Sequence, residues 1–508
     1  MNITTPCSYE NRFKIHGAYI CQPSDPEACE PCQKQFELGR KIMEMREAIV
    51  AMERQQSELE TQVNAHHDTL TRRLPLEVIA EIFKLCIHSS DIINTDFQMT
   101  QDRFSLTAPL ILSSVSQRWR NIAFSTPALW DHVPLHVTPA NMKSLPYLVK
   151  DWIDRSGQCP LSIFVQTNHE GARNLIEVLN QYSSRWRLLY FIGPSDHLSL
   201  FSSDMEGTAK LETLILSSTA PGTNTTFDLK NLLVRPKVLI TKHLRLKDVK
   251  IKLNHLSYLN VYDGLDVSEC LEVLRCAPRL QKCKMRPEIH QNSVPLPSKP
   301  IVHGMLLDIT LIGSRGLQIL QRLRCPSLTK LILERVMTLG WMTDVVEFVQ
   351  HSDCRIKYLF FSWIVLEKGD INILCNHIPN TLQHLHLTLS RPFPVFLFFD
   401  RLTIMSVTPE NIQPLYFPLL EELVIDQERL LDCASLLTLY RTRTNLKCLI
   451  LGKGVSIRWH RYTRPNTVTI VAKDDATLES TRTHFLALEQ EGVRLDLNVG
   501  KIAEGRKF

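Results

Sequence analysis

The sequence predicts an α/β fold with an N-terminal long, coiled-coil-like helix, a small all-helical domain, and stacked units of a parallel strand and an outer helix. Three patterns predict this. Apolar residues over 33–73 recur at alternating three- and four-residue steps. Two apolar, helix-patterned segments follow, LPLEVIAEIFKLCI at 74–87 and VSQRWRNIAFSTPALW at 115–130. An L-x-x-L-x-L pattern then recurs through the rest of the chain, as in repeat architectures.

Composition indicates a globular protein of a reducing compartment. The chain has 508 residues, 44% of them hydrophobic and 22% charged, which is ordinary for soluble proteins. A net charge of +5 is small for this length and favours neither nucleic acid nor a membrane surface as partner. Fourteen cysteines are too few for a disulfide scaffold and suit free, buried thiols. Because the chain has neither an apolar N-terminal run nor an apolar stretch of about 18 residues, we expect no secretory signal, no transmembrane helix, and a cytoplasmic and/or nuclear location.

Residues 1–32 are polar and irregular, which predicts a flexible N-terminal arm. The arm holds one C-x-x-C pair, Cys29 and Cys32, with Cys7, His16 and Cys21 upstream. Two such pairs at zinc-finger spacing would be a strong signal, whereas one pair with scattered partners is weak. We therefore predict no metal site and no cofactor.

The run 33–73 predicts a long heptad-patterned helix. One seam of this helix is polar only at Gln56 and His66 and consists of Leu38, Ile42, Met45, Ile49, Met52, Gln56, Leu59, Val63, His66 and Leu70. A sustained seam of this kind is typical of a coiled coil or of a long packed helix. Two interpretations remain open: the helix self-associates with a copy of itself, or it folds back on its own chain.

Residues 74–135 predict a small helical domain. Leu74 and Pro75 end one helix and begin the next, because proline is tolerated in a first turn but not inside a helix. A first helix then has one apolar face, formed by Leu76, Ile79, Ile82, Phe83 and Cys86. After a polar loop at 88–109, we expect one second helix with a face formed by Leu112, Val115, Trp119 and Ile122.

The two helical segments resemble an F-box, particularly the fungal F-box-like form. The residues that carry the resemblance are Leu74, Pro75, Glu77, Ile82 and Phe83 in the first half, and Val115, Arg118, Trp119, Arg120 and Ile122 in the second. The sequence departs from the pattern in its longer loop at 88–109 and in Ser116, where a cysteine is common. The resemblance implies docking onto a Skp-type adaptor of a cullin ubiquitin ligase through Leu74, Pro75, Glu77, Ile82, Phe83, Val115 and Trp119.

The remaining residues, 136–508, resemble a leucine-rich-repeat solenoid that ends in a C-terminal cap. Several copies of the L-x-x-L-x-L unit are 24 to 28 residues apart, and helical segments precede many of them. A weaker copy begins at Thr241. The gap between Leu280 and Leu328 predicts a degenerate copy near MLLDITLIG. Because one unit cannot bury its apolar face alone, stacking of successive units is expected.

Residues that flank the inward leucines predict a binding face, because side chains alternate across a strand and outward residues align between parallel copies. The predicted outward set also includes His243, Asn260, Lys330 and Glu334. From this alignment we predict a substrate-binding face formed by Arg245, Lys247, Tyr258, Tyr262, Lys282, Lys284, Arg286, Tyr358, Phe360, His384 and His386. Its basic residues and tyrosines suit an acidic or phosphorylated protein substrate. The alternative is a solvated face that merely keeps the protein soluble.

Two functions follow from these patterns. The first is a substrate-recognition adaptor of an SCF-type cullin ubiquitin ligase, in which the F-box binds the Skp-type adaptor and the repeats bind the substrate. The second is a non-ubiquitin leucine-rich-repeat scaffold that dimerises through the N-terminal coiled coil. We expect no enzymatic activity, because G-x-S-x-G, H-E-x-x-H, P-loop and G-x-G-x-x-G motifs are absent from the sequence. We also expect no nucleic-acid binding, since the basic cluster is local.

Overall fold

The computed structural model forms two compact units, residues 1–98 with 106–130, and residues 131–508 with 99–105. It describes residues 12–15, 18–21, 29–67, 73–87, 107–202, 207–208, 211–219, 226–229, 232–288, 299–391, 396–408, 411–426, 438–439, 441–443, 445–451, 455–460, 467–472 and 494–499, with a few positions between 478 and 490. The loop predicted at 88–109 lies outside the described residues up to position 106.

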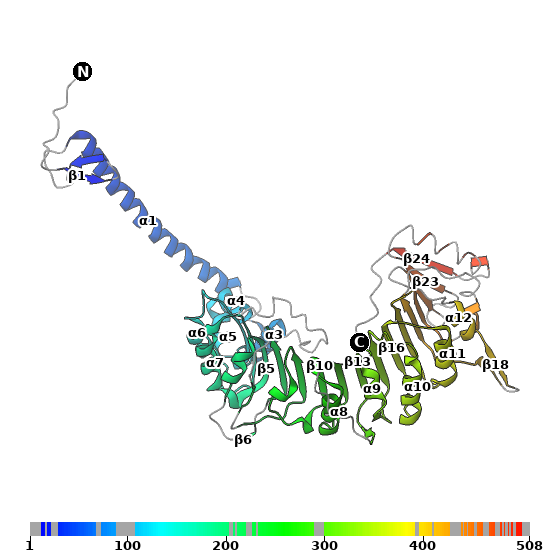
Figure 1. The fold of residues 1–508 in the computed structure, drawn as a ribbon. Helices are drawn as coiled ribbons and strands as arrows, with labels where there is room; N and C mark the ends of the chain where they lie inside the picture. The colour runs from blue at the N-terminus through cyan, green and yellow to red at the C-terminus, as the bar shows by residue number, and fades with distance from the viewer. Residues whose placement is uncertain are drawn as a thin grey trace. The chain divides into compact units, whose positions relative to one another are not determined.

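The first unit begins with an antiparallel pair of strands, β1 (Arg12–Ile15) and β2 (Ala18–Cys21), within the segment predicted as a flexible arm. The long helix α1 (Glu30–His67) follows and begins three residues before the predicted start (Figure 1). Its 38 residues correspond to a length of about 57 Å at 1.5 Å per residue. The prediction of one long N-terminal helix is therefore confirmed.

Four short helices complete the first unit: α3 (Leu76–Ile87), α4 (Thr107–Val115), α5 (Gln117–Phe124) and the 3-10 helix η3 (Pro127–Leu129). The prediction of one continuous second helix is wrong, because the chain leaves the helical conformation at Ser116, where φ is −157° and ψ is 164°. The Ser116 hydroxyl instead accepts a hydrogen bond from the Trp119 backbone N–H at 3.1 Å and caps α5.

The second unit contains one sheet of 16 strands with helices. The first 13 strands of this sheet are parallel to one another and lie side by side in chain order. They are β3 (His132–Val137), β4 (Leu161–Thr167), β5 (Trp186–Gly193), β7 (Thr213–Ser218), β9 (Val238–Lys242), β10 (Tyr258–Leu265), β11 (Lys282–Pro287), β13 (Asp308–Ile312), β15 (Lys330–Glu334), β16 (Tyr358–Ile364), β17 (His384–Leu389), β20 (Glu422–Asp426) and β21 (Cys448–Leu451). The α/β class with a large parallel sheet is thus confirmed.

The last three strands of the sheet are β22 (Val455–His460), β23 (Thr467–Ala472) and β24 (Arg494–Val499). Strand β22 is antiparallel to both β21 and β23, and β24 is parallel to β23. Small two-stranded pairs lie outside the main sheet: β6 (Gly207–Thr208) with β8 (Leu232–Leu233), β12 (Ile301–Val302) with β14 (Leu323–Arg324), and β18 (Met405–Thr408) with β19 (Asn411–Pro414).

Helices connect many of the parallel strands, and α8 to α11 lie along one side of the sheet (Figure 1). The α-helices of this unit are α6 (Leu145–Arg155), α7 (Arg173–Asn180), α8 (Val267–Cys276), α9 (Gly316–Leu320), α10 (Trp341–Ser352), α11 (Lys368–His377) and α12 (Phe396–Leu402). The 3-10 helices are η4 (Glu170–Ala172), η5 (Ser183–Arg185), η6 (Ser195–Leu200), η7 (Leu246–Asp248) and η8 (Leu253–His255).

Local sequence explains where these helices begin. The Asp266 carboxylate accepts a hydrogen bond from the Glu269 backbone N–H at 2.7 Å, while the Glu269 carboxylate accepts one from the Asp266 N–H at 3.0 Å. This reciprocal capping satisfies two backbone donors that the first turn of α8 leaves without partners. Glu367 and Asp370 form the same arrangement at the start of α11.

Alternation along the strands places the core between sheet and helices. In β15, Leu331 and Leu333 are buried, whereas Lys330 and Glu334 are half-buried on the opposite face. Trp341 of α10 packs edge-on against Phe361 of β16, with ring centroids 4.8 Å apart. The inward leucines predicted from the repeat pattern therefore form the core. The residues between them lie on the opposite face of the sheet, where they can contact neighbouring strands or a partner.

A left-handed backbone conformation recurs beside several strand ends. The φ angle is 55° at His243 after β9, 88° at Gly313 after β13, 59° at Arg335 after β15, and 53° at Trp363 within β16. The Gly313 and Arg335 N–H groups each donate to a carbonyl of the next strand at 2.7 Å. The conformation thus turns the chain out of the sheet while a backbone hydrogen bond to the neighbouring unit is kept.

The structure corrects two expectations about the array. The parallel sheet begins at β3, before the predicted boundary at 136. The copy predicted from Thr241 is out of register, because the strand there is β9 and ends at Lys242. The copy predicted near MLLDITLIG is confirmed as β13, which lies between β11 and β15.

Candidate functional site

The helices α3, α4 and α5 have an aromatic core. Ile79 and Phe83 of α3 are buried, and the Phe83 ring lies 4.8 Å from the ring of Trp119 on α5. The Trp130 indole N–H donates to the Ala123 carbonyl at 2.8 Å, which ties the exit of the unit to α5. These contacts satisfy the polar end of Trp130 and fix α3 against α5.

The same helices leave other apolar residues exposed. Val78, Ile82 and Leu85 follow one another at four- and three-residue steps along α3, so they share a face beside the buried one. Val78 and Leu85 are exposed, Leu85 to 78%, and Ile82 is half-buried. On α4, Ile111 and Val115 are also exposed. We call Val78, Ile82, Leu85, Ile111 and Val115 the helical apolar surface. Exposed apolar side chains that gather on neighbouring elements mark contact surfaces.

The predicted adaptor-binding residues divide between surface and core. Pro75, Glu77 and Val115 are exposed, and Leu74, Ile82 and Trp119 are half-buried. Phe83 is 1% exposed, so its ring serves the core and is not accessible for docking. The sequence prediction missed Val78, Leu85 and Ile111, although their spacing beside the core residues was a usable signal.

Most predicted substrate-binding residues lie in register on one face of the sheet. One row runs from Tyr258 through Lys282, Asp308, Lys330 and Tyr358 to His384 and Glu422 on successive strands. A second row runs from Asn260 through Lys284, Thr310, Ile332 and Phe360 to His386 and Val424. Tyr262 and Arg286 lie near the ends of β10 and β11. The register predicted from the repeats is therefore confirmed from β10 to β17, but Asn260, predicted as an outward residue, is buried.

Arg245 and Lys247 do not belong to these rows. The partners of Tyr258 and Asn260 on β9 are Val238 and Ile240. Arg245 and Lys247 are exposed beyond the strand, next to and within η7. The prediction failed because the Leu244 and Leu246 pattern belongs to a turn and not to a strand. The basic cluster thus extends over fewer strands than expected.

Acidic residues neutralise part of the predicted basic cluster. The Lys330 ammonium lies 3.5 Å from the Asp308 carboxylate, and the Lys284 ammonium lies 3.4 Å from the Glu334 carboxylate. Burial raises the pKa of Asp308, and the charge of Lys330 opposes that shift. Asp308 was missed because β13 was predicted only as a degenerate copy. In the described part of the chain, no ion pair involves Lys282 or Arg286, both of which are exposed.

Aromatic and histidine side chains form a second group on β16, β17 and β20. The Tyr358 and His384 rings are stacked, with centroids 4.4 Å apart and planes at 11°. The His384 Nδ1 lies 2.9 Å from a carboxylate oxygen of Glu422. Phe360 and His386 are 5.5 Å apart, and burial lowers the pKa of His386. The face is therefore basic at Lys282 and Arg286, and aromatic with acidic neighbours further along.

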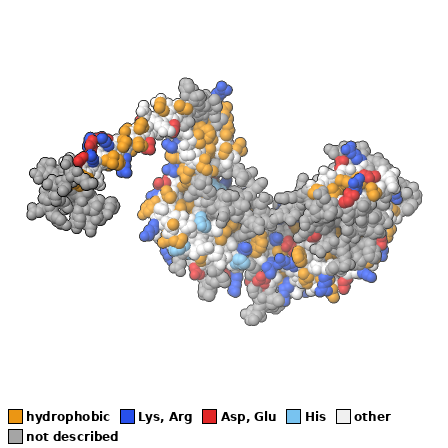
Figure 2. Space-filling view, turned by 90° about the horizontal axis from the view of Figure 1, so that it is seen from above, with side chains coloured by type: hydrophobic (Ala, Val, Ile, Leu, Met, Phe, Trp, Pro, Cys, Tyr) orange, Lys and Arg blue, Asp and Glu red, His pale blue; other side chains and the backbone are white. Residues whose placement is uncertain are grey.

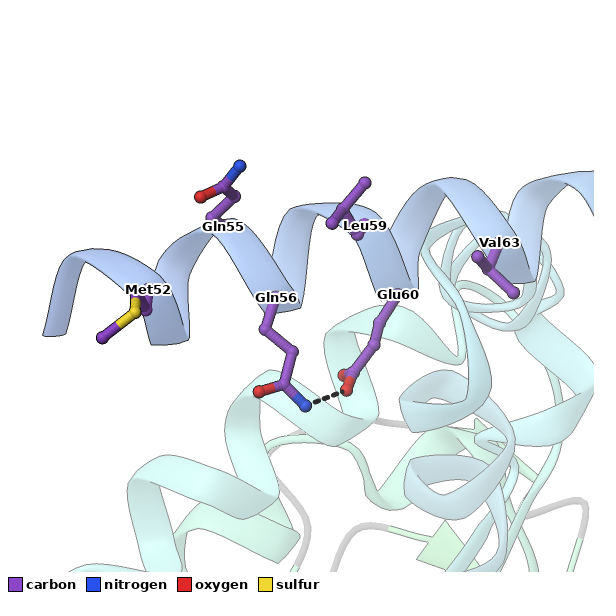
Figure 3. A pocket seen from close by; sticks show the side chains of 6 residues that line it. All are labelled: Met52, Gln55, Gln56, Leu59, Glu60 and Val63. Atoms are coloured by element: carbon purple, nitrogen blue, oxygen red, sulfur yellow. Dashed lines mark hydrogen bonds between the residues drawn. The ribbon is translucent and has the colours of Figure 1, made fainter. Parts of the chain in front are cut away.

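The apolar seam of α1 is a third surface. Its apolar members from Leu38 to Val63 are between 39% and 59% exposed. Figure 3 shows the pocket that Met52, Gln55, Gln56, Leu59, Glu60 and Val63 line, in which the Gln56 amide N–H donates to the Glu60 carboxylate at 2.9 Å. In Figure 2, hydrophobic side chains lie along α1 among charged ones. The described residues of the first unit thus leave this seam largely uncovered.

The residues in the described ranges contain neither a candidate metal site nor a helix that could span a membrane. No group of three or more His, Cys, Asp or Glu residues there is arranged to hold a metal ion. None of the helices in those ranges combines the length and apolarity needed to cross a bilayer. Comparison with models of known protein families finds no matching family, and comparison with curated proteins finds no match.

Proposed function

We propose that the chain is the substrate-recognition adaptor of an SCF-type cullin ubiquitin ligase. In this role the helices α3 to α5 act as an F-box that binds a Skp-type adaptor, and the parallel-stranded region acts as a leucine-rich-repeat solenoid that holds a protein substrate. The proposed role is positioning, since the chain raises the local concentration of substrate near the chemistry of other subunits. The proposed role requires no catalytic residue in this chain.

The observation that carries the proposal is the helical apolar surface. The core of α3 to α5 is formed by Phe83, Trp119 and their neighbours, yet Val78, Leu85 and Val115 remain exposed on the segments that resemble an F-box. Apolar side chains that are not needed for the core favour a partner that covers them. Pro75 and Glu77, which also match the F-box pattern, are exposed beside them.

The parallel sheet supports the substrate-binding half of the proposal. Its strands follow chain order, and leucines recur at the buried positions as a leucine-rich-repeat protein requires. Lys282 and Arg286 are exposed on one strand and are available to carboxylate or phosphate groups. We therefore propose that an acidic or phosphorylated segment of the substrate contacts β11, with Tyr258 and Tyr262 of β10 beside it.

The test of adaptor binding is co-purification of the full chain with a Skp-type adaptor and a cullin. Leu85→Glu and Val115→Glu place a charge on the helical apolar surface, and we expect each to weaken adaptor capture at least about tenfold. Gln117→Glu is the control, because Gln117 is exposed on α5, which carries no member of that surface. Unchanged adaptor capture by both variants would contradict the proposal.

The second candidate function is a non-ubiquitin scaffold that dimerises through α1. The exposed seam of α1 favours it, because such a seam is typical of helices that pair. Pull-downs separate the two candidates. A scaffold captures other proteins without any cullin, whereas the proposed adaptor captures a cullin that is lost in the Leu85→Glu and Val115→Glu variants.

A further inference from the structure

We propose that α1 pairs with α1 of a second copy of this chain as a parallel, in-register two-stranded coiled coil in which the two Gln56 side chains meet. The proposed adaptor function does not use this surface of α1. Three features of the seam favour the pairing: its exposure, the residue types along it, and the position of its one polar residue between Leu38 and Val63.

The described residues of the first unit leave the seam of α1 exposed. Leu38, Met45, Met52 and Leu59 are each more than half exposed over their surface. The eight seam positions from Leu38 to Val63 amount to four heptads, the length at which heptad patterns predict a coiled coil. A second copy presents the same seam and can cover it.

Residue types along the seam favour two parallel strands. With Leu38 at position d of the heptad, the a positions hold Ile42, Ile49, Gln56 and Val63, and the d positions hold Leu38, Met45, Met52 and Leu59. Beta-branched residues at a with unbranched residues at d favour parallel dimers over higher oligomers. Every apolar a position of α1 between these bounds is beta-branched, and no d position is.

Gln56 distinguishes the parallel from the antiparallel arrangement. In a parallel pair, Gln56 lies opposite Gln56 of the second copy, and the two amides hydrogen-bond across the seam. An antiparallel pair that uses the whole seam places Ile49 opposite Met52 of the second copy and Gln56 opposite its Met45. The Gln56 carbonyl then lies against a thioether. A buried polar group without a partner weakens association by roughly 5- to 150-fold.

Charges beside the seam oppose this preference, but weakly. In the parallel pair, Lys41 lies near Arg46 of the second copy, whereas in the antiparallel pair Arg46 faces Glu53 of the second copy. Such exposed pairs change association by at most about fivefold each. Lys41 also lies 2.9 Å from Glu37 of its own helix, which reduces the repulsion. The Gln56–Glu60 hydrogen bond uses one amide N–H and leaves the other atoms of the amide for the second copy.

Sedimentation equilibrium of the full chain tests whether the seam pairs. We expect a dimer, and we expect Ile49→Asp to raise its dissociation constant roughly 100-fold, because the charge enters the seam. Val50→Asp is the matched control, since Val50 is adjacent and equally exposed but lies outside the seam. It is expected to change dimerisation less than about twofold. A monomeric wild-type chain, or equal effects of the two variants, overturns the proposal.

Mapping of disulfides after mild oxidation tests the orientation. In the parallel pair, Leu59→Cys links to position 59 of the second copy, while Thr61→Cys, on the outer face, does not. A link between positions 42 and 59 in the Ile42→Cys, Leu59→Cys double variant shows an antiparallel pair and overturns the proposal. Failure of this dimer is distinguishable from failure of the adaptor function, because Ile49→Asp leaves the helical apolar surface unchanged and capture of a Skp-type adaptor reports on that surface separately.

Discussion

The parallel sheet and the long helix use the same apolar residue types in opposite ways. In the second unit, the leucines of successive strands, such as Leu331, Leu359 and Leu385, are almost completely buried. On α1, Leu38 and Leu59 are more than half exposed. Full burial of a leucine side chain stabilises a fold by about 1.5–3 kcal/mol. The sheet therefore supplies its own core, whereas the seam of α1 is exposed among the described residues of its own unit.

The helices α3 to α5 combine buried and exposed apolar residues. Ile79 and Phe83 are buried on one face of α3, while Val78 and Leu85 are exposed on the next. One short helix thus carries both a core face and a surface face. Apolar spacing thus identifies a helix, but only the structure shows which apolar face is already covered.

The greatest loss of stability is expected from a substitution in the core of the helices α3 to α5. Phe83→Ala should lower the free energy of unfolding of this unit by about 3–5 kcal/mol, because the Trp119 ring loses its partner and a cavity forms. Leu85→Ala, on the exposed face, should change it by less than about 0.5 kcal/mol. Hydrogen exchange of residues 76–124 measures both. Comparable effects at the two positions would show that the faces are not distinct.

A leucine pair tests the contrast between sheet and helix. Leu359→Ala in β16 should destabilise the second unit by about 2–5 kcal/mol, because the side chain is fully buried. Leu59→Ala on α1 should leave that unit unchanged. Urea denaturation of the full chain, followed by circular dichroism, separates the two outcomes. A loss of sheet stability in Leu59→Ala would disprove the independence of the two regions.

A smaller effect is expected on how the stability of the second unit depends on pH. Burial lowers the pKa of His386 from its usual 6.5, with partial opposition from Asp426 and Glu422. The unfolded chain therefore binds this proton more readily than the folded one. The stability that neutral His386 contributes is complete above pH 6.5 and is lost as the pH falls through the lowered pKa.

Substitution isolates this contribution. His386→Gln removes the titrating group, so the melting temperature of the variant should fall less than that of the wild type between neutral and mildly acidic pH. Thermal melts over that range measure the difference. If the two proteins show the same pH dependence, His386 is not the group responsible.

The smallest effect concerns the left-handed residues beside the strands. Arg335→Gly should change stability by less than about 1 kcal/mol, in the stabilising direction, since glycine adopts a φ of 59° without the steric cost of a side chain. Arg335→Val should instead lower stability by about 1 kcal/mol, because a beta-branched residue fits this conformation poorly. Chemical denaturation compares the three proteins. A destabilising Arg335→Gly would indicate that the Arg335 side chain makes a contribution larger than the strain.

Sequence reasoning located the elements that have a strong local period. The seam of α1 could be predicted, and so could the strands β15, β16 and β17, which follow Leu328, Ile356 and Leu382. Buried apolar residues recur there at fixed offsets, so the local pattern is enough to set the register of each strand. The row from Tyr258 to His384, except for Asp308, followed from that register alone.

Other features depend on contacts that no local period encodes. The break at Ser116 results from a competing side-chain cap, and the misplaced copy at Thr241 arose because leucines of a turn imitate those of a strand. The ion pairs of Asp308 and Glu334 join different strands, so they appear only once the strands are aligned. The helical apolar surface was only partly predicted, because burial of Phe83 depends on its packing against Trp119.

The chain-order arrangement of the parallel strands has a consequence for biosynthesis. Apart from β3 at the edge, each of these strands pairs with the strands that come immediately before and after it in the main sheet, so no segment must wait for a distant part of the chain. A polypeptide that emerges from the ribosome at about 5–20 residues per second can therefore add one strand to the growing edge within a few seconds. The region is built to assemble progressively from its N-terminal end while translation continues.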